Sequence, residues 1–156
     1  MSRTSVAVER SQADIRSLLV GYIAEGYRIE ERREPSGQEW GVVEWGYAGQ
    51  RVRFEVPVEQ PNQAAIEQVA RRARTRKREE IEEDEREGLR RETWRSLAQS
   101  IGARMRAVGS GVETFEEAFL AHLLTPSGQQ LYVQLAGGPQ GSQLGLPAPT
   151  AEVVTD

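Results

Sequence analysis

Hydrophobic residues near the N-terminus recur every three or four positions, which predicts a helix. Its apolar positions are Ile15, Leu18, Leu19, Tyr22 and Ile23. Ser11 and Asp14 have the spacing of a capping box and predict where the helix begins, and Gly26 predicts where it ends. We therefore expect a first helix between residues 11 and 26, with residues 5–8 ahead of it as a short strand or an ordered lead-in.

The hydrophobic period becomes two from Tyr27 onward, which is typical of strands with one buried face. Three strand-like stretches follow, separated by turn residues at 35–37 and 47–50. In the third stretch, Val52, Phe54, Val56 and Val58 alternate with Arg51, Arg53 and Glu55. Pro57 removes a backbone donor, so we expect this strand to end at an edge of the sheet.

Helical spacing returns at residue 63 and continues through a charged helical segment, 63–91. A further helix is predicted over 89–109, with apolar positions at Trp94, Leu97, Ala98, Ile101, Met105 and Val108. A short helix begins at Thr114, and residues 130–136 have the composition of a last strand. Residues 137–156 are rich in Gly and Pro without any period, which predicts a disordered tail.

These elements predict a single α+β domain over residues 1–136. The expected order is α-β-β-β-α-α-α, with or without a final strand. The small antiparallel sheet, of about three to four strands, is covered by helices.

The amino-acid composition excludes several classes of functional site. With no Cys and one His, disulfide scaffolds, zinc ribbons and cysteine nucleophiles are excluded. The sequence has no Gly-x-Ser-x-Gly motif and no Gly-containing loop of alternating acids that would suit a cation. His122 is more consistent with a packed or surface residue than with a catalytic one. We expect a non-enzymatic protein without metal or cofactor.

No stretch resembles a signal peptide or approaches the roughly 20 apolar residues that cross a bilayer. We therefore expect a soluble, cytoplasmic protein that does not associate with membranes.

The charge pattern is most uneven between residues 71 and 87, where six bases in 71–78 precede seven acids in 79–87. Opposite-sign and like-sign neighbours at i,i+4 are nearly equal in number, so they do not explain the pattern. Three interpretations stay open: a solvated helix, an antiparallel self-association strip, and a phosphate-binding strip. The residues of the phosphate-binding strip are Arg71, Arg72, Arg74, Arg76, Lys77 and Arg78.

The predicted sheet offers a second basic surface. Arg51 and Arg53 share its polar face, and Trp40 or Trp45 would supply a stacking platform for bases. Trp40 and Trp45 are an odd number of residues apart, so in a regular strand one of them faces the polar side. The alternative is that the aromatic residues belong to the core while the arginines pair with acids on the same strands: Glu30, Glu44 and Glu55.

Three stretches resemble a family of short, largely uncharacterised phage and prophage proteins. They are WRSLAQSIGARMRAVGSGVETFEEAFLAHLLTPSG (94–128), VERSQADIRSLLVGYIAEGYR (8–28) and GQRVRFEVPV (49–58). In that family a Trp-Arg-x-Leu helix leads to a Thr-x-Glu-x-x-Phe-Leu helix. The resemblance implies a phage genomic context and a host-cell cytoplasmic location, and it transfers no catalytic residue.

Together these observations predict an accessory protein that binds nucleic acid in phage DNA replication or recombination. The alternative is a protein-binding module, either a homo-oligomer or an inhibitor of a host protein, that acts through the charge-segregated helix.

Overall fold

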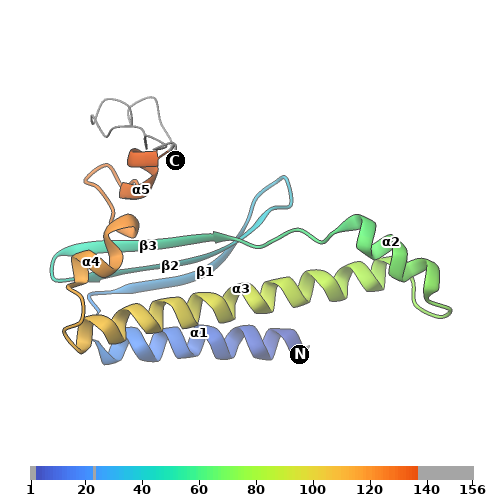
Figure 1. Cartoon of the computed structure of the whole chain (residues 1–156), viewed down its shortest axis with the longest axis horizontal. Helices are drawn as coiled ribbons and strands as arrows, with labels where there is room; N and C mark the ends of the chain where they lie inside the picture. The colour runs from blue at the N-terminus through green and yellow to red at the C-terminus, as the bar shows by residue number, and fades with distance from the viewer. Residues whose placement is uncertain (1–2, 23, 137–156) are drawn as a thin grey trace, which may run out of the picture.

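The computed structural model describes residues 3–22 and 24–136 and confirms the α+β class. The predicted disordered tail, 137–156, lies outside the described residues. The elements in chain order are α1 (Arg3–Gly21), β1 (Tyr27–Arg33), β2 (Glu39–Tyr47), β3 (Gln50–Pro57), α2 (Gln63–Arg72), α3 (Arg78–Gly109), α4 (Phe115–Phe119), η1 (Leu120–His122) and α5 (Leu131–Ala136). The three strands form one antiparallel sheet in the order β1-β2-β3. The long helices α1 and α3 both lie along the same face of this sheet (Figure 1).

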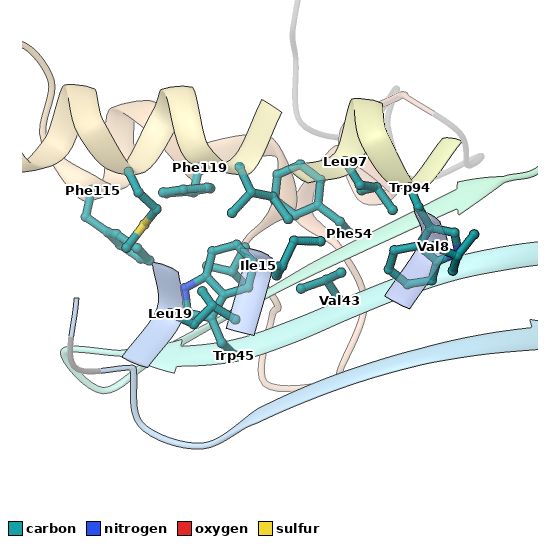
Figure 2. Close-up of a cluster of buried hydrophobic side chains, with 13 residues drawn as sticks. Val8, Ile15, Leu19, Val43, Trp45, Phe54, Trp94, Leu97, Phe115 and Phe119 are labelled. Carbon is teal, nitrogen blue, oxygen red and sulfur yellow. The ribbon is translucent and has the colours of Figure 1, made fainter. Parts of the chain in front are cut away.

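The core lies between this face of the sheet and the two long helices (Figure 2). Trp45 of β2 is its largest strand residue and is 0% exposed. Its ring stacks on Phe54 at 5.9 Å between centroids and meets the edge of Phe119 at 5.3 Å. Such aromatic pairs add to the free energy of burying their surface. The alternation predicted for β3 is confirmed, because Val52 and Phe54 are buried while Arg51 is exposed.

Gly41 lets α3 approach the middle strand. A Cβ added at Gly41 would lie 3.0 Å from Leu97 Cδ1, which is closer than ordinary van der Waals contact, and 3.4 Å from Trp94 Cζ2. An alanine at this position would therefore require the end of the Leu97 side chain to move by a few tenths of an ångström.

The predicted start of the first helix is wrong, because α1 begins at Arg3 and not at Ser11. Ser11 and Asp14 lie inside the helix, where their side chains do not cap its end. Val8 explains the earlier start: it lies seven residues before Ile15 on the same helix face and is buried in the core with it.

The stretch 130–136 is not a strand, because residues 131–136 form the short helix α5. The chain instead reaches the edge of β3 earlier, where Leu123 forms an isolated antiparallel bridge with Val52. The Leu124 N–H donates to the Arg51 carbonyl at 2.8 Å. Sheet pairing beyond β3 is therefore limited to this bridge in the described part of the chain.

The charged segment is two helices and not one, because the chain leaves the helical conformation between α2 and α3 at residues 73–77. The expected boundary near residue 89 is also wrong, since α3 runs unbroken past it. The break places Arg71 and Arg72 in the last turn of α2, and Glu79 and Glu80 in the first turn of α3. Both placements complement the helix dipoles, whereas the same charge order in one continuous helix would oppose them.

No helix in the described ranges is long and apolar enough to cross a membrane.

Candidate functional site

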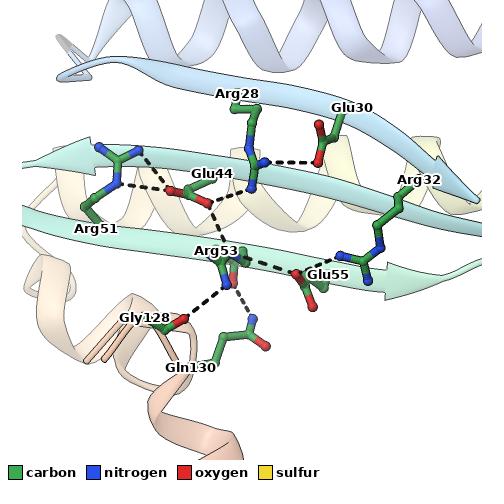
Figure 3. A network of polar contacts seen from close by, with 9 residues as sticks. All are labelled: Arg28, Glu30, Arg32, Glu44, Arg51, Arg53, Glu55, Gly128 and Gln130. Atoms are coloured by element: carbon green, nitrogen blue, oxygen red, sulfur yellow. Dashed lines mark hydrogen bonds and ion pairs between the residues drawn. The ribbon is translucent and has the colours of Figure 1, made fainter. Parts of the chain in front are cut away.

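The face of the sheet that α1 and α3 leave open carries a network of arginines and glutamates (Figure 3). Glu44 is at its centre on the middle strand. Its carboxylate is 3.0 Å from Arg28 Nη2, 3.1 Å from Arg51 Nη2 and 3.0 Å from Arg53 Nε. The register explains this convergence, because Arg28 and Arg53 are the direct neighbours of Glu44 on β1 and β3.

The Glu44 side chain is only 12% exposed. Burial alone would raise the pKa of Glu44, but hydrogen bonds from Arg53, Arg51 and Arg28 and the charge of Arg53 outweigh it and lower that pKa below its ordinary value. Glu44 is therefore held as a carboxylate, and it occupies donors of three arginines that a phosphate would otherwise use.

Two further glutamates pair with arginines on this face, Glu55 with Arg32 and Glu30 with Arg28. Arg32 Nη1 is 3.3 Å from Glu55, and Arg28 Nη1 is 3.2 Å from Glu30. The predicted alternative for this surface, in which the arginines pair with Glu30, Glu44 and Glu55, describes the geometry. Val42 pairs in register with Glu30 and Glu55 and is fully buried although it points to the open face.

The two tryptophans of β2 lie on opposite faces of the sheet, as predicted from their odd separation in sequence. Trp45 is buried in the core, where no base can reach its ring. Trp40 lies on the open face, and the Arg32 guanidinium sits 5.4 Å from the centre of its ring in a cation–π contact. Trp40 is therefore the tryptophan with access to a ligand, and Arg32 competes for its face.

A groove of about 560 Å³ lies beside Arg51 and Arg53, between β3 and the segment 123–128. The Arg53 Nη1–H donates to the Gly128 carbonyl at 3.2 Å. Arg53 is thus bound on two sides, by Glu44 and by this loop (Figure 3).

The other candidate cations gather at the tip of the helical hairpin formed by α2 and α3, away from the sheet (Figure 1). We call Arg71, Arg72, Arg74 and Lys77 the tip cations. All four are exposed, and none has an ion pair with any residue that the structure describes. The two other predicted cations of this segment do have acidic partners, since Arg76 is paired with Asp84 and Arg78 is 3.6 Å from Glu67.

The start of α3 adds unpaired backbone donors to this tip. Lys77 is the N-cap residue of α3 and makes no side-chain capping hydrogen bond. In contrast, Asn62 caps α2 by accepting from the N–H groups of Ala64 and Ala65. The backbone N–H groups of Arg78 and Glu79 therefore have no hydrogen-bond partner among the described residues, whereas those of Glu80 and Ile81 donate to the Lys77 carbonyl.

A clamp between β1 and α3 was not predicted. The Arg90 guanidinium donates two hydrogen bonds to Glu31, at 2.6 and 2.8 Å, and the Trp94 Nε1–H donates a third at 3.0 Å. Burial raises the pKa of Glu31, but the hydrogen bond and charge of Arg90 and the hydrogen bond of Trp94 lower it overall. The clamp links α3 to the edge strand β1, because Arg90 and Trp94 of α3 both donate to Glu31.

His122 packs against the core. Its ring stacks on Phe54 with centroids 3.8 Å apart. Burial, and next the charge of Arg104, lower the pKa of His122 below its ordinary value, so it is neutral at neutral pH. No group of three or more acidic or His side chains in the described ranges is arranged to hold a metal ion.

Comparisons with protein families, curated proteins and solved structures found no match for this chain. The resemblance to phage proteins therefore stays a prediction, and the candidate site rests on its own geometry.

Proposed function

We propose that the protein binds nucleic acid through the tip of the α2–α3 hairpin. The observation that carries this proposal is that the tip cations Arg71, Arg72, Arg74 and Lys77 are exposed and lack a carboxylate partner among the described residues. Cations without an internal partner can release counterions from a phosphate backbone, and this release supplies most of non-specific nucleic-acid affinity.

The position of the tip favours the same ligand. The hairpin extends beyond the end of the sheet, so a long polyanion can approach it without meeting the rest of the domain (Figure 1). The acids of α3 limit the contact, because Glu79 and Glu80 are exposed in its first turn. We therefore assign phosphate contact to the end of α2 and the turn, with no reading of base sequence.

The test is fluorescence anisotropy with a labelled 20-base-pair duplex at several salt concentrations. In the tip variant, Arg71, Arg72, Arg74 and Lys77 are changed to Gln. If each cation neutralises one phosphate, the slope of log affinity against log salt becomes shallower by about 3.6.

A control variant with the same net charge separates the tip from overall charge. It changes Arg10, Arg16, Arg33 and Arg95 to Gln, four exposed arginines without an ion pair in the described part of the chain. We expect it to bind nearly as the unchanged protein does. No binding by the unchanged protein at low salt, or equal losses in both variants, would overturn the proposal.

Self-association through the hairpin is the second candidate. It is favoured by Glu79, Glu80 and Glu85, which are exposed on the same hairpin and have no ion pair within the described ranges. A second copy laid antiparallel would bring these acids to the tip cations. Light scattering without DNA decides between the candidates, since only this one predicts a dimer whose mass falls to that of a monomer in high salt.

A role in phage DNA replication or recombination is the wider proposal, and it is supported by the sequence resemblance alone.

A further inference from the structure

The outer edge of β3 is only partly paired. The Leu124 N–H and the Gln130 side-chain amide donate to the carbonyls of Arg51 and Arg53. Residues two apart in a strand direct their backbone groups to the same side, so the N–H and C=O of Glu55 also face this edge. Neither group has a hydrogen-bond partner in the part of the chain that the structure describes.

An open apolar groove of about 500 Å³ lies directly beside this unpaired edge, between β3 and α3. Its apolar lining includes Phe54, Val56 and Leu97, and His122 also lines it. A strand added at Glu55 would place alternate side chains on the helix side of the sheet, in this groove. Backbone donors and a side-chain pocket are thus available to the same extended peptide.

The charge of the groove selects among peptides. Glu59 and Glu92 line it, and neither has an ion pair among the described residues. No Lys or Arg lines it. The C-terminal residues 137–156 of the chain itself carry two acids and no base, so they lack the complementary charge. A peptide with Lys or Arg beside an apolar residue has the positive charge that complements Glu59 and Glu92.

We propose that the β3 edge at Glu55 binds an extended basic peptide of a partner protein by strand addition, with an apolar side chain of the peptide in the groove. The peptide would extend the backbone pairing of this edge, where the Leu124 N–H already donates to the Arg51 carbonyl. This site is separate from the hairpin tip and does not depend on nucleic-acid binding.

The experiment begins with selection of linear twelve-residue peptides from a displayed random library on the full-length protein. We expect enriched sequences with an apolar residue flanked by Lys or Arg. One enriched peptide is then synthesised with a single N-methyl group moved along its backbone. Methylation of the amide facing Glu55 is expected to weaken binding about tenfold, and methylation of its immediate neighbours less than about twofold.

Two protein variants locate the site. Ser96→Arg places a cation in the groove lining, and Gln99→Arg places the same side chain elsewhere on the exposed surface of α3. Both residues are exposed on a helix, and Arg is a good helix former, so both variants are expected to fold. Peptide binding should weaken about tenfold in Ser96→Arg and stay unchanged in Gln99→Arg.

Three outcomes would overturn the proposal: no enriched sequence, an N-methyl scan without the period of two, or equal binding by the two variants. A concentration-dependent dimer that Ser96→Arg disrupts would also overturn it, because the occupant would then be a second copy of this chain. The tip variant should bind the peptide normally, so failure of this proposal is distinguishable from failure of nucleic-acid binding.

Discussion

The arginines of the open sheet face and the cations of the hairpin tip differ in what surrounds them. On the sheet, Glu44 on the middle strand accepts from Arg28, Arg51 and Arg53 on both neighbouring strands. At the tip, Arg71 and Arg72 lie in the last turn of α2, with no carboxylate within ion-pair distance among the described residues. The number of arginines on a surface therefore does not indicate a binding site, because strand register can place an acid among them.

The largest expected effect is the loss of duplex affinity when the tip cations are removed. Changing the four tip cations to Gln should lower duplex affinity about 100-fold or more at 50 mM salt, while the free energy of unfolding stays within about 0.5 kcal/mol. Changing Arg51 and Arg53 to Gln should leave the duplex affinity nearly unchanged and lower the free energy of unfolding, because those arginines form ion pairs within the fold. Anisotropy and urea denaturation on each variant check both halves, and a loss of affinity from the sheet pair alone would invert the comparison.

Glu44→Gln should give the next largest effect. It leaves three arginines around a neutral, mostly buried amide, and we expect the free energy of unfolding to fall by about 1–3 kcal/mol. Glu85→Gln is the control, because Glu85 is exposed and has no ion pair in the described ranges, and it should change stability by less than about 0.5 kcal/mol. Equal stability of the two variants in urea would show that the network contributes nothing.

The pH dependence of stability sharpens the same comparison. The folded-state pKa values of Glu44 and Glu31 are lowered, so their contribution is complete above the ordinary Glu pKa of about 4.3 and is lost as the pH falls from there through the folded values. Urea midpoints measured between pH 6 and 3 should therefore decline less steeply in Glu44→Gln than in the unchanged protein. Parallel curves would contradict the lowered pKa of Glu44.

The smallest effect is expected at the exposed rim of the network. The Arg28 side chain is 50% exposed, so Arg28→Ala should cost about 0.5 kcal/mol, of which only part is coupling to Glu44. A double-mutant cycle with Glu44→Gln measures that coupling. A coupling of several kcal/mol would show that solvent screens this pair far less than its exposure implies.

The division of the sheet into two faces follows from the sequence. Alternation places Val52 and Phe54 opposite Arg51 and Arg53, and an odd separation sends Trp40 and Trp45 to different faces. Such local patterns have a period of two and need no knowledge of the rest of the fold.

Features that depend on distant contacts were not predictable in the same way. No Gly or Pro marks the break at residues 73–77, and the hairpin depends on α2 packing back against α3. The clamp joins Glu31 to Arg90 and Trp94, which are 59 and 63 residues away in sequence. The change from bases at 71–78 to acids at 79–87 does favour two helices over one, because it suits the dipoles of both. The packing of α2 on α3 and the clamp have no such local pattern.

Within the described part of the chain, hydrogen bonds link α3 to the sheet along only part of its length. It has 32 residues, and its last hydrogen-bonded link to the sheet in the direction of the tip is Arg90 with Glu31, within the described part of the chain. The overhang from Arg78 to Arg90 is about 18 Å long at about 1.5 Å per residue. Over this stretch α2 packs against α3, and Arg78 at the start of α3 contacts Gln63 and Glu67 of α2. The two helices therefore carry the tip cations together, and a change in the angle of the hairpin would move these cations as one unit relative to the sheet.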